Sequence, residues 1–369
     1  MFDPVIAFFT RIFEAVGRWI GRLVAAILWP FKAMGRWYTR RGWIVRGIVG
    51  LIVLIWLGSY IYYFWQTQHW ANFNPNYIAS YNLSEREVAP GSPVPGKDNT
   101  CATSAIVDVT AGLIDFNVNQ NSWIPSLFLS KLGFFGMAWK YTPFFDNKAA
   151  FQLGINEVVR RTAQELVDRL GRVRGTSQID QNLQDARQNV YYNEDFWYFS
   201  LSPFGLKSPT WTSYRQAIKN FHQFNERLAR CDANYDPRAD NLLRFFEQMA
   251  SMLGSTSDIL DGQMAASNAG WFDPRADDRF WFAFGELYAL KGIMTAAASD
   301  FSTIFRERGL TKNWQKMDKN LDDALKIQPW IISNGGEAAF IMPSHLATMG
   351  FRLLTVRTNL TEMRDILDR

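Results

Sequence analysis

The segment YYNEDFWYFSLSPFG, residues 191–205, holds the side chains in this chain that are best suited to chemistry. Two adjacent acids, Glu194 and Asp195, are followed closely by Trp197 and Tyr198. Paired carboxyl groups beside aromatic platforms occur in clefts that process sugars, so these four are candidate ligand-binding residues. The alternative, which we favour, is a buried aromatic loop between two helices, in which the rings supply packing area.

Other catalytic patterns are weak or missing. His222 and Glu226 are four residues apart on one expected helix, but no third metal ligand is evident and a packing or surface pair explains them as well. The sequence contains neither a GxxxxGK[ST] nor a GxGxxG loop for phosphate groups. We therefore assign no catalytic residue, no metal and no cofactor, and the sequence names no reaction.

The sequence YDPRADN at residues 235–241 returns as FDPRADD at residues 272–278. An aspartate at the N-cap accepts hydrogen bonds from unpaired backbone N–H groups, and proline suits the first helical position. The second acid of each motif then lies in the first turn, where the helix dipole favours negative charge. We predict that Asp236 and Asp273 cap two helices and that the motif arginines pair with a neighbouring helix.

Cys101 and Cys231 are the only two cysteines. In an oxidising compartment an even number favours a disulfide, which would tie the segment around residue 101 to the helix before YDPRADN. Two buried thiols are the alternative, because the distance between the residues cannot be obtained from sequence.

The segments that must position these groups begin with an apolar stretch, GIVGLIVLIWLGSYIYYFW, residues 47–65. It carries no charge and as a helix would extend ~28 Å, close to the ~30 Å hydrocarbon core of a bilayer. Residues 1–46 contain eight basic and two acidic residues, whereas the first charge after the stretch is Glu85. The positive-inside rule places the N-terminus in the cytoplasm and residues after about 66 outside. A small-residue cleavage site is not evident, so we predict an uncleaved single-pass anchor, residues 47–66.

The first 30 residues predict an amphipathic helix with a narrow polar face and a wide apolar one. We expect this helix to lie in the bilayer interface with its arginines at anionic headgroups. The alternative is a second spanning helix whose charges face a partner in an oligomer. We expect Pro30 to end the helix before a basic linker at residues 31–46. The expected headgroup contacts are Arg11, Arg18, Arg22, Arg40 and Arg41.

The rest of the chain predicts an all-α helical bundle at residues 105–369, preceded by an extended lead-in at residues 67–104. Apolar residues recur with helical spacing in residues 147–174 and 210–231, and residues 280–298 are apolar on nearly all sides, which is typical of a central helix. Residues 104–116, SAIVDVTAGLIDF, fit a strand or a helix.

The phrases NSWIPSLFLSKLGFF, NVYYNEDFWYF and ANYDPRADNL, together with the N-terminal anchor, resemble the bacterial domain-of-unknown-function family 2333. The resemblance extends from about residue 40 over nearly the whole chain. It implies a bacterial inner-membrane protein with one N-terminal span and supplies no catalytic residues.

These features favour a structural or interaction protein that presents a periplasmic helical domain, in a homo- or hetero-oligomeric membrane complex. A periplasmic module or hydrolase acting on cell-wall glycan or lipid is the alternative. Nucleic acid is not an expected partner, because the excess basic charge adjoins the apolar stretch and does not lie on the folded domain.

Overall fold

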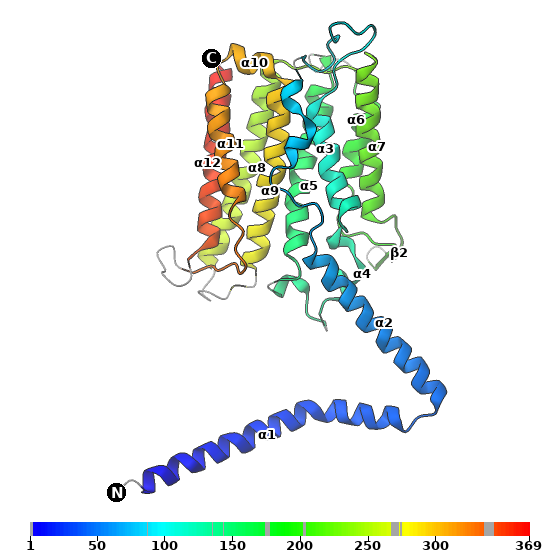
Figure 1. The fold of residues 1–369 in the computed structure, drawn as a ribbon, viewed down its shortest axis with the longest axis vertical. Helices are drawn as coiled ribbons and strands as arrows, with labels where there is room; N and C mark the ends of the chain where they lie inside the picture. Colours follow the sequence, from blue (N-terminus) through cyan, green and yellow to red (C-terminus); the bar gives the residue numbers. More distant parts are fainter. Residues whose placement is uncertain are drawn as a thin grey trace. The chain divides into compact units, whose positions relative to one another are not determined.

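The computed structural model describes residues 3–86, 88–134, 136–142, 144–173, 178–201, 204–266, 273, 275–335 and 343–369. The chain forms two compact units, Met1–Tyr62 and Tyr63–Arg369. Within the described residues almost all regular structure is helical, which confirms the predicted all-α class (Figure 1).

The first unit consists of α1 (Asp3–Thr39) and most of α2 (Trp43–Gln68). The prediction that Pro30 ends the first helix is wrong, because α1 continues through Pro30 and leaves only a short connection to α2. An internal proline removes one backbone hydrogen bond and crowds the preceding turn, which can bend a helix without ending it.

The second unit contains the last turns of α2 and the bundle. The lead-in forms η1 (Tyr77–Tyr81) and η2 (Leu83–Glu85). The other short elements are the π-helical turns η3 (Phe116–Gln120) and η6 (Leu166–Leu170), the 3₁₀ turns η4 (Ile124–Ser126) and η5 (Trp139–Tyr141), and α4 (Phe128–Leu132) and α10 (Ser302–Glu307). The longer helices are α3 (Ala105–Asp115), α5 (Asn147–Glu165), α6 (Gln181–Val190), α7 (Thr210–Ala229), α8 (Ala239–Ala266), α9 (Ala276–Asp300), α11 (Thr311–Leu325) and α12 (His345–Leu367).

Helix α9 is the central helix, as its nearly uniform apolar sequence predicts. It packs against α3, α5, α8, α11 and α12, and most of its residues are buried. Two glycines let α9 and α5 approach closely: a Cβ atom at Gly154 would lie 2.0 Å from the carbonyl oxygen of Phe282, and one at Gly285 would lie 2.2 Å from that of Phe151. Any larger residue at either position would force the two backbones apart.

Residues 104–116, which fit a strand or a helix by sequence, form α3 and the start of η3. The Ser104 hydroxyl caps α3 by accepting the Val107 N–H. The carboxylate of Asp300, at the end of α9, accepts hydrogen bonds from the Ser104 hydroxyl at 2.7 Å and from the Ala105 N–H at 2.8 Å. This buried contact with α9 favours the helix over the strand for residues 104–116.

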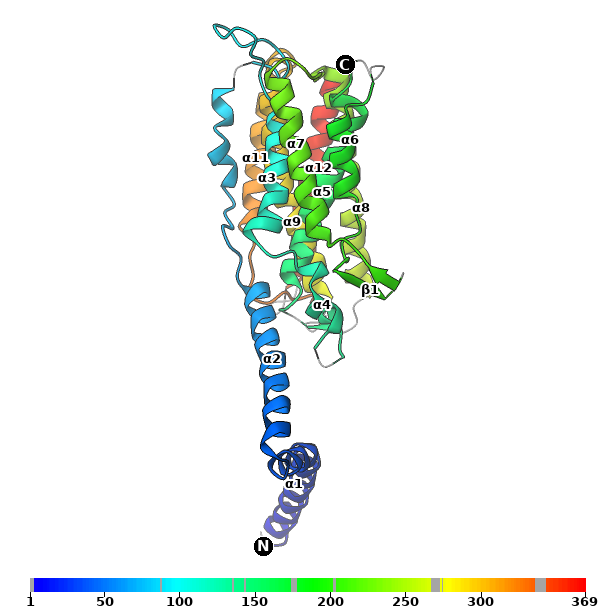
Figure 2. The ribbon, with the colours of Figure 1, turned by 90° about the vertical axis from the view of Figure 1, so that its right-hand side faces the viewer.

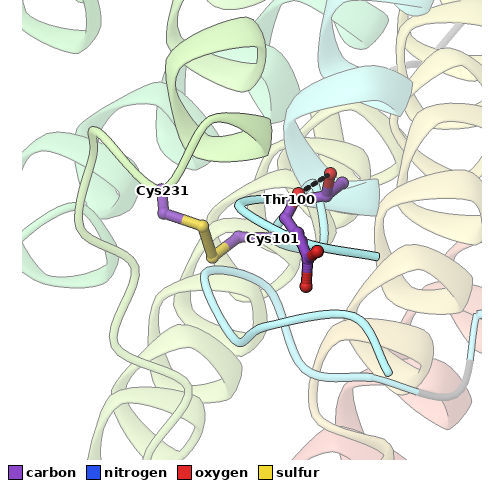
Figure 3. Close-up of a disulfide and its surroundings, with 4 residues drawn as sticks. Thr100, Cys101 and Cys231 are labelled. Carbon is purple, nitrogen blue, oxygen red and sulfur yellow. Dashed lines mark hydrogen bonds between the residues drawn. A yellow bond between two sulfur atoms is a disulfide. The ribbon is translucent and has the colours of Figure 1, made fainter. Parts of the chain in front are cut away.

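Within the second unit, the lead-in runs along the bundle to the end opposite residues 63–68 (Figures 1 and 2). The ring of Tyr77 stacks on Tyr288 of α9, with centroids 4.6 Å apart. At the far end Cys101 and Cys231 form a disulfide with Cα atoms 5.3 Å apart, drawn in Figure 3 beside Thr100. The bond joins the end of the lead-in to the segment that follows α7, a pairing that the sequence left open.

We call the end of the second unit that Tyr63–Gln68 of α2 join the entry end. The hairpin of β1 (Phe199–Leu201) and β2 (Phe204–Leu206) and helix α4 both lie there (Figures 1 and 2). The hairpin is antiparallel, with Phe199 opposite Leu206.

Candidate functional site

A cleft of about 400 Å³ opens at the entry end of the bundle. Five segments line it: the end of α2, the segment from η4 to η5, the start of α5, the loop between α6 and β1, and the start of α9. Its polar side chains include Ser130, Asp146, Asp195, Asp278 and Arg279. The rings of Tyr63, Trp139 and Phe282 supply apolar surface.

The elements that bring the acids together are two helix N-termini. Asp146 occupies the N-cap of α5, where its backbone carbonyl accepts the Ala150 N–H at 2.9 Å, but its side chain does not cap the helix. Asp277 and Asp278 lie in the first turn of α9. Helix dipoles favour acids at both places. Because α5 and α9 pack in parallel, with both N-termini at the entry end, the acids come close enough to repel one another.

Burial dominates the electrostatics of this acid group. It raises the pKa of Asp146, and the neighbouring carboxyl groups of Asp278 and Asp277 raise it further. Burial, followed by the charge of Asp278, also raises the pKa of Asp277 to about 7. A carboxyl group that stays protonated near neutral pH can donate a hydrogen bond or a proton, as acid pairs do in several hydrolases.

The cleft can therefore bind a ligand that offers both polar oxygens and an apolar face. Neutral carboxyl groups can donate to hydroxyl or carbonyl oxygens, the exposed Arg279 can bind an anionic oxygen, and the rings can stack against a sugar or an acyl chain. A grouping of three or more histidine, cysteine or acidic residues suited to a metal ion is not found within the described part of the chain.

The four residues predicted at residues 194–198 separate in the structure. Asp195 lines the cleft, whereas Glu194 binds Arg160 and Asn156 of α5. The ring of Trp197 lies against Phe128, with centroids 4.9 Å apart. Tyr198 packs against Trp197 and Trp211, so it does not line the cleft with Asp195.

Sequence reasoning missed Asp146, Asp278 and Arg279. Asp146 stands in FFDNKAA directly before an apolar helical pattern, and Asp278 is the final acid of FDPRADD. The sequence around each acid predicts only that it lies at the start of a helix. No local pattern predicts that the starts of these two helices meet in the fold.

The predicted capping roles of Asp236 and Asp273 need correction. Helices α8 and α9 begin at Ala239 and Ala276, three residues after each aspartate, so neither aspartate is the N-cap residue. The Asp273 carboxylate does accept a hydrogen bond, at 3.1 Å, from the N–H of Arg275, which lies two residues later and still before the helix. An Asx turn therefore precedes the helix, because aspartate side chains bond backbone N–H groups readily outside helices.

The arginine of the first motif copy pairs locally and not with a neighbouring helix as predicted. Arg238 contacts the carboxylates of Asp236 and Asp240, each at 3.0 Å. The motif tyrosine, Tyr235, is buried and donates a hydrogen bond to Asp300 at 3.1 Å. Phe272 and Pro274 of the second copy lie outside the described residues.

The predicted headgroup residues all lie in the first unit and are all exposed: Arg11, Arg18, Arg22, Arg40 and Arg41. Arg18 forms an ion pair with Glu14 at 3.4 Å, and the Arg41 guanidinium lies 5.0 Å from the centre of the Trp37 ring. Their contact with lipid stays a prediction.

The described residues define an all-α protein with one helix, α2, that is long and apolar enough to cross a membrane. Residues 128–269 match the model of the family described as an uncharacterized protein conserved in bacteria, DUF2333, which confirms the predicted family resemblance. The match covers NVYYNEDFWYF, ANYDPRADNL and the second half of NSWIPSLFLSKLGFF. It is shorter than the predicted extent, which began at about residue 40 and ran over nearly the whole chain, and it does not reach the N-terminal helices. Neither the curated proteins nor the solved structures contain a significant match.

Proposed function

We propose that this chain is a single-pass protein of the bacterial inner membrane that presents a helical domain to the periplasm and acts as a structural or interaction component of a membrane complex. The observation that carries the proposal is α2: none of its most apolar window is buried against protein. Exposing such a helix to water is costly, and a bilayer removes that cost.

The orientation rests on the charges that flank α2. The basic residues of the first 46 positions precede the helix, and the positive-inside rule assigns that side to the cytoplasm. The disulfide supports the same orientation, because such bonds persist in the periplasm and are rare in the cytosol.

Carbonate extraction of membranes and reporter fusions test the anchorage and its direction. We expect the full-length chain to stay in the membrane pellet, and fusions at residue 40 and residue 369 to report opposite compartments. Recovery in the soluble fraction, or the same compartment at both positions, would refute the proposal. Purification in mild detergent should recover a stoichiometric partner or a homo-oligomer, and a monomer without a partner would contradict the role in a complex.

A second candidate function is a periplasmic module that binds glycan or lipid, which the cleft favours. Asp195 and the buried Asp146 line it beside aromatic side chains, and this combination suits a polar ligand with an apolar face. We expect cell-wall fragments or phospholipids to raise the unfolding temperature of the native chain, and Asp195→Asn to abolish that shift. The matched control is Asp98→Asn in the far loop, and an equal shift in both variants would reject the cleft as the site.

A further inference from the structure

Exposed apolar side chains gather at the entry end of the bundle, on three separate segments. The segment from α4 to α5 contributes Phe128, Leu132, Phe134, Met137, Tyr141 and Phe144, which are 39–49% exposed. On the hairpin, Phe204 and Leu206 are 80% and 86% exposed. In the loop after α11, Trp330 is 97% exposed. We call these three segments the apolar rim.

The segments of the apolar rim belong to one end of the second unit. Phe128 contacts Trp197, which lies two residues before the hairpin. The loop after α11 reaches the start of α9 through Asn334, whose amide donates to the Asp273 carboxylate at 3.0 Å. Elsewhere on the described part of the second unit, large exposed apolar residues are scattered over other helices and loops and do not form a comparable set.

The apolar rim is fixed to the end of α2. Within the second unit, Tyr63 lies against Trp139 and Phe64 against Phe145, with ring centroids 4.8 and 5.7 Å apart. The buried Lys148 ammonium donates to the backbone carbonyls of Gln66 at 3.0 Å and His69 at 2.7 Å. The place where the apolar helix leaves the domain is therefore set by packing and hydrogen bonds, not by a free tether.

The charge of the rim segments suits a lipid surface. Residues 128–146, 196–207 and 327–335 contain three lysines, Lys131, Lys140 and Lys207, and one acid, the buried Asp146. Anionic headgroups attract lysine and repel acids, while exposed aromatic side chains prefer the interfacial region of a bilayer. A 26-residue helix is ~39 Å long, which exceeds the ~30 Å hydrocarbon core and brings its last turns to the headgroups.

We propose that the apolar rim inserts into the outer headgroup region of the same bilayer that α2 spans, so that the entry end lies on the membrane and the cleft opens at its surface. A second copy of the chain could also cover such a rim, but the covalent link to α2 brings lipid to it at every protein concentration. The inference rests on the proposed membrane anchorage.

A fluorescent label on the hairpin tests this placement in the full-length chain. The two natural cysteines are bonded to each other, so Leu206→Cys provides a single site for a polarity-sensitive dye. Lys97→Cys is the control, since Lys97 lies in the loop beside the disulfide, about one α7 length (~30 Å) from the hairpin. Trp330→Cys gives an independent measurement from another rim segment.

The labelled proteins are reconstituted in vesicles of zwitterionic and anionic phospholipid, some bearing a nitroxide quencher near the headgroup. We expect blue-shifted emission and strong lipid-dependent quenching at positions 206 and 330, with protection from iodide in the water. The label at position 97 should show emission typical of water, little quenching by the lipid-bound nitroxide and free access to iodide. Iodide access at positions 206 and 330 equal to that at position 97 would overturn the proposal.

Two further outcomes keep the causes separate. If protection at position 206 disappears when the vesicles hold a single chain each, a second copy covers the rim and the lipid proposal fails. Co-sedimentation of each labelled chain with the vesicles reports the anchorage by itself. If a chain sediments with the vesicles while its label stays in water, only the proposed insertion of the apolar rim is refuted. If the chain does not sediment, the proposed membrane anchorage is refuted.

Discussion

The Arg160 guanidinium binds the Glu194 carboxylate, with Nη1 and Oε1 2.5 Å apart. Both side chains are largely buried, and the Asn156 amide donates to the same carboxylate oxygen at 3.2 Å. Arg160 also donates to the backbone carbonyls of Val190 and Tyr192, so it fixes the first residues of the loop after α6 to α5. Glu194 thereby orients its neighbour Asp195 toward the cleft without lining it.

This ion pair predicts different roles for two adjacent acids. Glu194→Ala should lower the free energy of unfolding by about 2 kcal/mol, because it leaves the partly buried Arg160 without its carboxylate. Asp195→Ala, at an exposed position, should change it by less than about 0.5 kcal/mol. Denaturant unfolding in mild detergent measures both, and equal effects would contradict this assignment.

The buried acid in the first turn of α9 predicts a pH dependence. The pKa of Asp277 is raised in the folded state to about 7, so the folded chain holds a proton that the unfolded chain releases near pH 4. Stability must fall as the pH rises between these values, by roughly 4 kcal/mol for this group.

Asp277→Asn should remove that loss, and the variant should be more stable than the native chain at pH 8 and similar to it at pH 4. The control is Asp240→Asn, an exposed acid in the first turn of α8. The unfolding temperature is measured from pH 4 to pH 8 for all three proteins. If it changes with pH in the same way for the native chain and for Asp277→Asn, the pKa of Asp277 is not raised.

The contact between α5 and α9 predicts a strong response to a single methyl group. Gly154→Ala places a Cβ atom against the Phe282 carbonyl oxygen and should lower the free energy of unfolding by about 3 kcal/mol. Gly262→Ala in α8 meets no atom within 4 Å and should raise it by about 0.5–1 kcal/mol, because alanine has the higher helix propensity. Thermal unfolding of the two variants should shift in opposite directions.

The disulfide closes a loop with a sequence separation of 130 residues. Loop-closure entropy then predicts a stabilisation of about 4–5 kcal/mol. The double variant Cys101→Ala and Cys231→Ala should unfold at a temperature lower by about 10 °C. The native chain under reducing conditions should match it, and an unchanged midpoint in both would exclude a stabilising bond.

Much of the bundle could be predicted from the sequence because helical periodicity is a local property. The apolar spacing of residues 147–174 and 210–231 predicted α5 and α7 with the turn that follows α5, and the uniform apolarity of residues 280–298 predicted the central position of α9. Residues 104–116 were ambiguous, since their helix depends on Asp300, almost 200 positions later in the chain. Helix boundaries near Pro30 and the two DPRAD motifs were also misplaced, because proline and aspartate permit more than one local geometry.

The sequence by itself determined an all-α chain with one long apolar helix and a basic N-terminal segment, since composition and periodicity fix these without any distant contact. Only the tertiary structure decided which acids share a cleft and which cysteines bond. The cleft joins Asp146, Asp195 and Asp278 from three segments, and it separates Asp195 from Glu194, its neighbour in the chain. Chemistry at such a site depends on distances across the fold, and these are set by how helices pack against one another.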